Sequence, residues 1–304
     1  MSILTKVSEA FALADIDVTT KARVLLEALP YIQRFQGSIF VIKYGGSFMD
    51  DPNPALRQRV ATDITFLAAV GIHVVVVHGG GKAITRAMEE AGVEPAWVKG
   101  LRVTDAATVK IVEEVLNQSV NADICQILEA EGARPVGMAG NDLLQCVPRV
   151  IDVEGETVSL GRVGQLQNVI AEPIHAALMA GKTPILSPIA KDESGNIYNT
   201  NADEAAAQVA ISLGARRLVY LCDVPGLMLE PSQEASLIST LPVKDVDVLK
   251  TEGIITSGML PKVDSGVRAL ANGVSRVHLV DGRLPHSILL EIFTDKGIGT
   301  EIVN

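Results

Sequence analysis

A chain of 304 residues with 48% hydrophobic side chains is long enough to bury a core in one large α/β domain or in two lobes. Its formal net charge of -10 and its lack of a basic run argue against nucleic acid and anionic membranes as partners, because those surfaces bind clustered Lys and Arg. Its aromatic content of 4%, beside plentiful Ala, Val, Leu and Gly, is typical of small-residue helices packed on a buried parallel sheet.

The three cysteines, Cys125, Cys146 and Cys222, lie far apart and form no C-x-x-C pair. They indicate neither a disulfide framework nor a thiolate metal site, so we expect a cytoplasmic protein. The first residues lack the basic start and the unbroken apolar stretch of a signal peptide. The longest apolar runs are strand-sized, and we therefore expect no membrane-spanning segment.

Two helices are expected ahead of the main fold. Apolar residues recur at helical spacing over the first dozen positions, at Ile3, Leu4, Val7, Ala10 and Phe11. This spacing predicts an amphipathic helix whose apolar stripe needs a partner surface. A second helix is expected after it, capped by Thr19 or Thr20, kinked or ended by Pro30 and stopped by Gly37.

After Gly37 the predicted strands and helices alternate along the chain. Strands are expected at 38–43, 73–77, 134–138, 183–187, 217–222 and 276–280. Helices are expected at 53–69, 83–91, 171–180, 203–213, 261–271 and 288–293, with one or two more within 104–131. This alternation favours an α/β fold, an open three-layer αβα sandwich with a mainly parallel central sheet.

Two β-hairpins are expected to interrupt the alternation. Alternating apolar and polar residues flank Glu154-Gly155, and a second turn is predicted at Ser194-Gly195. A lobe boundary is expected near Ser187. It would divide the chain into a helical extension at 1–36, an N-terminal lobe at 37–186 and a C-terminal lobe at 187–304.

Glycine clusters follow the first two strands of the main fold. Gly45 and Gly46 come directly after Lys43 and Tyr44, and HGGGKAI begins at His78. In open α/β sheets, ligands collect outside the carboxyl ends of the strands, where glycine lets backbone N–H groups approach a phosphate. One such turn could be only a tight corner, but two at equivalent positions indicate a phosphate site.

The common nucleotide-binding loops do not fit. Gly181-Lys182-Thr183 resembles the end of a P-loop, but Ala176 occupies the position of the first glycine, so a helix C-terminus is expected there. No G-x-G-x-x-G follows a strand, which disfavours a nicotinamide enzyme. No C-x-x-C pair accompanies the five histidines, and we expect no metal site built from protein ligands.

Six motifs carry a family resemblance: KYGGS, VVVHGGGKAI, KGLRVTD, NTNADEAAAQVA, LCDVPGL and TSGMLPKV. Their order, from about Ser38 to the end of the chain, resembles the amino acid kinase family, and most closely its members that act on N-acetyl-L-glutamate. The resemblance implies phosphorylation of the γ-carboxylate of N-acetyl-L-glutamate by ATP, with Mg²⁺ held by the nucleotide phosphates. The product would be the acyl phosphate of arginine biosynthesis.

The resemblance implies catalytic roles for Lys43, Asp203 and Lys262. Lys43 would lie against the transferring phosphoryl group, and Lys262 would face the nucleotide phosphates from the other lobe. Phosphoryl transfer needs cations where oxygen charge develops, and two lysines supply them. Asp203 would orient both lysines without acting as a base, because the acceptor is already a carboxylate. Taken alone, Asp203 could instead be an N-terminal charge of its helix.

The resemblance also implies residues that bind the reactants. Arg102 would grip the acceptor's α-carboxylate with its planar two-pronged guanidinium, and Asn199 would bond the N-acetylated substrate. Backbone donors are expected from two glycines on the nucleotide side and two on the acceptor side, namely Gly45 and Gly46, then Gly80 and Gly81. Asp223 would belong to the nucleotide side, or would be an ordinary turn residue.

The C-terminal stretch resembles the arginine-binding region of feedback-inhibited family members. There His278, Glu291 and Gly297 match positions that contact the inhibitor, and a carboxylate at Glu291 suits a guanidinium. A solvated helix face would explain Glu291 equally well. Together with the N-terminal helix, the resemblance implies a hexamer built as a trimer of dimers. The sequence leaves open whether the PII nitrogen-signalling protein binds, as it does in cyanobacterial and plant relatives.

Two other functions stay open at this point. The chain could be another kinase of the family, such as carbamate kinase, glutamate 5-kinase or an aspartokinase, although KGLRVTD and NTNAD favour N-acetylglutamate. It could also be a non-catalytic arginine-sensing module. Lys43, Asp203 and Lys262 argue against that function, because a pure sensor needs no cations at both ends of a phosphoryl path.

Overall fold

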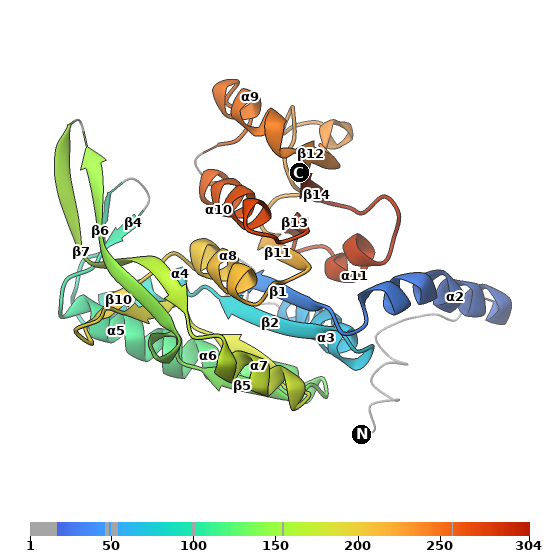
Figure 1. The fold of residues 1–304 in the computed structure, drawn as a ribbon, viewed down its shortest axis with the longest axis horizontal. Helices are drawn as coiled ribbons and strands as arrows, with labels where there is room; N and C mark the ends of the chain where they lie inside the picture. The colour runs from blue at the N-terminus through green and yellow to red at the C-terminus, as the bar shows by residue number, and fades with distance from the viewer. Residues whose placement is uncertain (1–16, 46–48, 50–53, 99–100, 154, 257) are drawn as a thin grey trace.

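The computed structural model describes residues 17–45, 49, 54–98, 101–153, 155–256 and 258–304. The amphipathic helix predicted at the start of the chain lies outside these described residues. At the centre is an eight-stranded sheet with the order β12-β14-β13-β11-β1-β2-β8-β5 (Figure 1). Its strands are β1 (Ile39–Tyr44), β2 (His73–His78), β5 (Pro135–Met138), β8 (Thr183–Leu186), β11 (Arg217–Cys222), β12 (Thr240–Pro242), β13 (Arg276–Asp281) and β14 (Thr300–Val303).

Neighbouring strands of this sheet pair in parallel, except for the antiparallel pair β13–β14. The predicted mainly parallel sheet is therefore confirmed. Central strand β1 pairs with β2 on one side and β11 on the other, so strands from both sides of the predicted lobe boundary form one continuous sheet. The division into lobes stays a prediction.

Helices cover both faces of the sheet, as expected for strands that are apolar along their whole length. Val41, Val75 and Tyr220 share one hydrophobic core with α7 (Glu172–Met179), α8 (Ala202–Ser212) and α10 (Leu260–Ala271). Phe40, Ile42 and their neighbours share the other core with α3 (Pro54–Ala69), α6 (Asn121–Ala130) and α11 (Ser287–Ile292). The three-layer arrangement is thus the predicted one (Figure 1).

The two predicted hairpins are confirmed as antiparallel pairs. Strands β6 (Leu144–Val153) and β7 (Glu156–Val169) pair with each other, and β9 (Ile189–Lys191) pairs with β10 (Ile197–Asn199). These four strands close into a small barrel in the order β10-β7-β6-β9. The far end of the β6–β7 hairpin projects away from the body of the molecule (Figure 1).

The helix before the sheet, α2 (Val18–Phe35), differs from its prediction in two ways. Its N-cap is Asp17, whose carboxylate accepts hydrogen bonds from the backbone N–H groups of Thr19 and Thr20, so neither threonine is the cap. The helix also does not end at Pro30 but continues to Phe35, so of the two predicted effects of this proline, a kink or an end, the end is wrong. It ends before Gly37, whose φ of 74° suits glycine.

Several short elements were not predicted. They are β3 (Ala96–Val98), β4 (Leu101–Val103), β12, β14 and α9 (Val246–Thr251). A π-helical stretch at Val115–Val120 also joins α5 (Thr108–Glu114) to α6. Segments of three to six residues contain too few repeats for apolar periodicity to reveal them.

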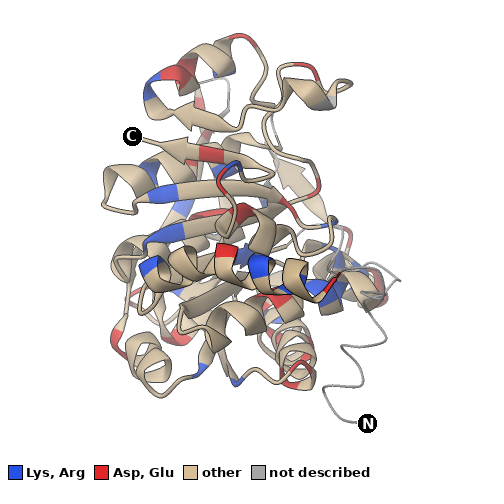
Figure 2. Cartoon of the chain, turned by 90° about the vertical axis from the view of Figure 1, so that its right-hand side faces the viewer, with Lys and Arg blue, Asp and Glu red and all other residues tan. Residues whose placement is uncertain are grey.

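No helix in the described part of the chain is long and apolar enough to cross a membrane. Side chains of both signs are interspersed over the described elements in the view of Figure 2. This distribution agrees with the absence of a basic run in the sequence.

Candidate active site

Three charged side chains meet at the carboxyl edge of the sheet. Lys43 comes from the end of β1, Asp203 from the first turn of α8 and Lys262 from the first turn of α10. The Lys262 ammonium donates a hydrogen bond to Asp203 Oδ2 over 2.8 Å. The Lys43 Nζ lies 3.1 Å from Oδ1, an ion-pair distance, although Oδ1 accepts no hydrogen bond within the described structure. The structure therefore brings together the three residues predicted to be catalytic.

The charges of this cluster do not cancel. Burial raises the pKa of Asp203, but Lys43 and Lys262 outweigh that effect and hold its pKa below the usual value. Burial lowers the pKa of Lys262, whereas Asp203 raises it, and the net shift is upward. Two ammonium groups thus share one carboxylate at a site that is almost closed to solvent. The excess positive charge suits an anionic ligand such as a phosphoryl group.

Two neighbours fix the position of Asp203. The Asn201 side chain caps α8 by accepting hydrogen bonds from the backbone N–H groups of Asp203 and Glu204, at 2.8 and 3.1 Å. The buried Tyr220 hydroxyl donates to the Asp203 carbonyl over 3.2 Å and shares a 2.7 Å hydrogen bond with Ser265 on α10. Burial raises the pKa of Tyr220 well above its usual value. Tyr220 was not predicted, since one Tyr in an apolar strand gives no signal.

The two glycine turns touch beside Lys43. Gly79 donates a hydrogen bond to the Tyr44 carbonyl over 2.7 Å, and a Cβ on Gly45 would lie 2.5 Å from the Lys43 Nζ. A Cβ on Gly80 would similarly lie 2.5 Å from a methyl group of Leu116. Helix α4 (Gly81–Glu90) begins immediately after, so its backbone donors face this edge. Gly46 lies outside the described residues.

A cavity of about 200 Å³ opens next to this cluster. The predicted acceptor residues Gly80, Gly81, Arg102 and Asn199 all line it, as do Asn201 and Ala202, which precede Asp203. Trp97, which was not predicted as a site residue, also lines it. A second cavity of about 470 Å³ shares Gly81, Trp97 and Arg102 with the first.

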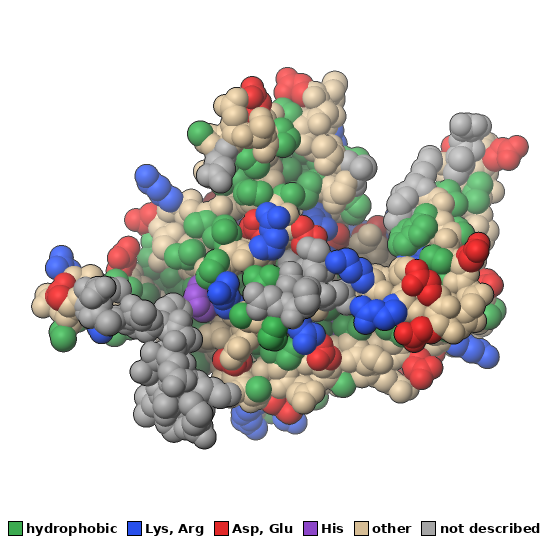
Figure 3. Space-filling model, turned by 180° about the vertical axis from the view of Figure 1, so that it is seen from behind, with side chains coloured by type: hydrophobic (Ala, Val, Ile, Leu, Met, Phe, Trp, Pro, Cys, Tyr) green, Lys and Arg blue, Asp and Glu red, His purple; other side chains and the backbone are tan. Residues whose placement is uncertain are grey.

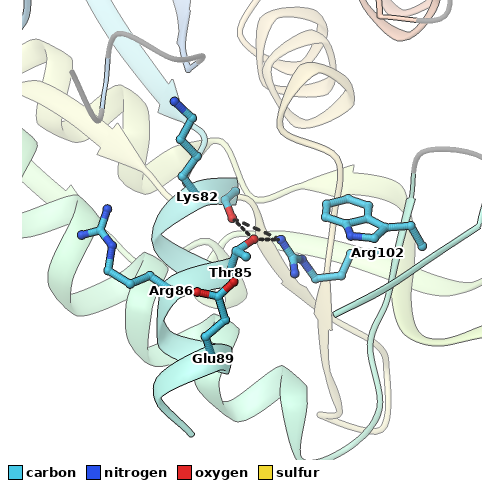
Figure 4. Close-up of a pocket in the computed structure, with 7 residues that line it drawn as sticks. Lys82, Thr85, Arg86, Glu89 and Arg102 are labelled. Carbon is cyan, nitrogen blue, oxygen red and sulfur yellow. Dashed lines mark hydrogen bonds between the residues drawn. The ribbon is translucent and has the colours of Figure 1, made fainter. Parts of the chain in front are cut away.

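Arg102 is the junction between the two cavities. Its Nη2 donates to the Gly81 carbonyl over 3.1 Å and to Thr85 Oγ1 over 2.8 Å, both on α4 (Figure 4). The residue is only 5% exposed, and burial lowers the pKa of its guanidinium. No carboxylate of the described residues forms an ion pair with it. A buried cation without an anionic partner is costly, so this position favours an anionic ligand.

Comparison with known proteins identifies the family. A sequence model of the amino acid kinase family matches residues 38–281. The acetylglutamate kinase of Syntrophomonas wolfei is 46% identical over 289 residues, which cover 95% of this chain and 99% of that protein. This chain belongs to the amino acid kinase family, among its acetylglutamate kinases. The acetylglutamate kinases of Clostridioides difficile and Nostoc punctiforme are 44% and 43% identical, over 96% and 93% of their lengths.

Solved structures of the amino acid kinase fold agree with this assignment. The N-acetylglutamate synthase of Neisseria gonorrhoeae, complexed with coenzyme A and N-acetylglutamate, has a TM-score of 0.81 and 28% identity over 95% of this chain. The chain spans only 64% of that synthase. The carbamate kinase of Giardia lamblia bound to AMP-PNP, at 17% identity and a TM-score of 0.55, shares the fold alone.

Asp223 lies outside the buried cluster of Lys43, Asp203 and Lys262 in this amino acid kinase. It directly follows β11 at the same edge of the sheet and is exposed. Burial lowers the pKa of Lys262, whereas the charges of Asp203 and Asp223 both raise it. The structure therefore places it near Lys262 without making it part of the buried cluster.

The three residues predicted to bind arginine form a separate cluster. His278 Nδ1 lies 2.7 Å from Glu291 Oε1, and Glu291 Oε2 accepts hydrogen bonds from the N–H groups of Ile298 and Gly299. Gly297 has a φ of 61°, and a Cβ there would lie 2.6 Å from the same carboxylate. Glu291 is buried, so the alternative of a solvated helix face is wrong. Burial raises the pKa of Glu291, but His278 and the backbone donors have the larger effect, so its pKa lies below the usual value.

Arg217 is a further charge near this cluster that was not predicted. It lies on β11, where it pairs with Arg276 on β13. Val219, two positions later, pairs with His278, so the side chains of Arg217 and His278 lie on the same face of the sheet. It is buried, and burial together with neighbouring arginines lowers its pKa to about 10. That face carries α3 and α11, whereas α8 and α10 of the catalytic cluster cover the other.

Proposed function

We propose that this kinase transfers the γ-phosphoryl group of ATP to the γ-carboxylate of N-acetyl-L-glutamate, giving N-acetyl-L-glutamyl 5-phosphate for arginine biosynthesis. One observation carries the proposal: Lys43 and Lys262 converge on Asp203 beside a cavity that Arg102 and Asn199 line. The relationship to full-length acetylglutamate kinases supports this choice of acceptor over carbamate, glutamate and aspartate. It also argues against a module that only senses arginine.

The geometry suits an in-line transfer. With its α-carboxylate on Arg102 and its acetylated end at Asn199, the acceptor would present its γ-carboxylate toward Lys43. A carboxylate oxygen attacks the γ-phosphorus while the bond to the β-phosphate oxygen breaks and ADP leaves. The charge on the transferring oxygens falls between the two ammonium groups, which Asp203 holds in place. No base is needed, because the acceptor is already ionised.

We propose that Mg²⁺ enters with the ATP phosphates. Mg²⁺ is commonly bound by one or two carboxylates together with substrate phosphates, and it neutralises charge that develops on them. In the described part of the chain, no three acidic, His or Cys side chains converge as a metal site. Asp203 is a poor ligand, because both its oxygens face ammonium groups.

We also propose that L-arginine inhibits this enzyme at the cluster of His278, Glu291 and Gly297. The resemblance assigns these residues to the inhibitor site, and the L-arginine complex of the gonococcal synthase supports it, since that relative of the fold binds the same ligand. The proposal also includes a cytoplasmic hexamer and its recognition by the PII protein, as the resemblance implies.

A direct assay separates this function from its rivals. Purified protein with ATP and Mg²⁺ should release ADP with N-acetyl-L-glutamate, and the product should form a hydroxamate with hydroxylamine, as acyl phosphates do. Carbamate, L-glutamate and L-aspartate serve as matched acceptors. Faster turnover with any of these three would refute the proposed acceptor, and arginine binding without any turnover would restore the sensor.

A further inference from the structure

Trp97 and Arg102 form a cross-strand pair in a small isolated ribbon. Strands β3 and β4 make a two-stranded sheet of their own, in which these two residues lie directly opposite each other. Side chains in such a pair project from the same face of the ribbon. The Arg102 Cζ lies 4.3 Å from the centre of the Trp97 ring, which is within the range of a cation–π contact.

Arg102 is therefore held from two directions. Helix α4 accepts hydrogen bonds from one edge of the guanidinium through Gly81 and Thr85, and the Trp97 ring covers its face. A carboxylate binds a guanidinium through the N–H groups in its plane, whereas an aromatic ring binds it through the face. The two interactions do not compete, so the ring can stay in place while an acceptor carboxylate binds.

The Trp97 ring can stabilise the buried charge of Arg102. Only 5% of Arg102 is exposed, and no carboxylate among the described residues pairs with it, so burial removes part of its hydration without supplying an anion. The negative face of an indole replaces part of that lost solvation. Trp97 itself is 54% exposed and lines both cavities, so acceptor binding must change the surroundings of its ring.

We propose that Trp97 is a positioning residue for the acceptor, which holds the Arg102 guanidinium in the plane that receives the α-carboxylate. The inference rests on the proposed function, since it assigns Arg102 to that carboxylate. It leads to one expectation for the steady-state kinetics and one for the tryptophan fluorescence. Trp97 should affect acceptor binding more than turnover, and the emission of this chain, which has one tryptophan, should report the binding.

The kinetic test compares three substitutions. Trp97→Leu keeps an apolar side chain without an aromatic face, and should raise the KM for N-acetyl-L-glutamate by about 3- to 10-fold. Its kcat and its KM for ATP should change by less than about twofold, because the phosphoryl path is untouched. Trp97→Phe keeps an aromatic face and should stay near the wild type. In an Arg102→Ala background, Trp97→Leu should cause no further loss, because the contact it removes is already gone.

The optical test uses the unmodified protein. Titration with N-acetyl-L-glutamate should shift or quench the tryptophan emission, whereas ADP alone should leave it unchanged. An unchanged KM in Trp97→Leu, equal losses in the Leu and Phe variants, or a silent titration would each overturn the inference. If Trp97→Leu fails to fold, the titration still decides. Failure of the wild type to phosphorylate N-acetyl-L-glutamate would instead refute the proposed function.

Discussion

At the scale of single residues, charge balance explains the active site. One carboxylate, Asp203, lies between two ammonium groups, so the cluster keeps an excess positive charge that a phosphoryl group can neutralise. Arg102 shows the same principle on the acceptor side, as a buried cation without an ion-pair partner among the described residues. Both sites are prepared for anions before any ligand arrives.

Removal of the Lys43 charge tests this preorganisation. Lys43→Ala should lower kcat by about a hundredfold to a thousandfold while the fold persists, because the lost donor acts mainly on the transition state. Lys182→Ala is a matched control, since Lys182 is exposed and belongs to the sequence that resembles a P-loop. Near-normal turnover of Lys43→Ala in steady-state assays would refute the role of this residue.

The lowered pKa of Asp203 predicts a pH effect on stability. A carboxylate whose folded pKa lies below its unfolded value stabilises the fold above the unfolded pKa, and loses this effect as the pH falls through the folded pKa. The difference in melting temperature between wild type and Asp203→Asn should therefore be largest near neutral pH and shrink below about pH 4. Calorimetry across that range measures it, and a constant difference would contradict the charge assignment.

At the scale of helices and strands, the sequence predicted long periodic elements well and short ones poorly. The strand that ends at Lys43 and the helix that begins near Asp203 were predicted because apolar repeats and capping residues mark them. The β3–β4 ribbon was missed, and Trp97 with it, because three-residue strands carry no periodicity. The hydrogen bond between Tyr220 and Ser265 depends on the packing of β11 against α10, which no local sequence pattern shows.

A contact between helices gives a second prediction at this scale. Buried Asp63 on α3 lies 2.7 Å from the Nδ1 of His286 and accepts hydrogen bonds from backbone N–H groups at the start of α11. Asp63→Ala should destabilise the fold by about 1–3 kcal/mol, because it leaves buried donors without a partner. Thermal unfolding measures this loss. Asp247→Ala, at a highly exposed carboxylate, is the control, and equal melting temperatures for the two variants would disprove the capping role.

At the scale of the whole molecule, helix α2 packs on the core only near its end, at Tyr31, Ile32 and Phe35, and its earlier part exposes apolar side chains. It projects from the body of the molecule (Figure 1), with hydrophobic side chains on its surface (Figure 3). The exposed ones are Val18, Val24, Leu25, Leu26 and Leu29. A stripe of this kind needs a partner surface, which agrees with the proposed assembly of dimers into a hexamer.

Truncation tests that assembly. Removal of residues 1–16, the predicted amphipathic helix, should leave active dimers with weaker arginine inhibition, because the links between dimers are lost. Size-exclusion chromatography with light scattering gives the mass, and an inhibitor titration gives the response to arginine. An unchanged hexamer after truncation would rule out this role for the segment.

The central claim is that ammonium groups on either side of one cleft act on the same phosphoryl group. A crystal structure with ADP, Mg²⁺, N-acetyl-L-glutamate and tetrafluoroaluminate, which mimics the transferring group, tests it most directly. We predict that the Nζ atoms of Lys43 and Lys262 both lie within about 3.2 Å of the analogue or of the adjoining phosphate oxygens. Side chains that point into separate cavities, with only one ammonium group near the analogue, would contradict the account.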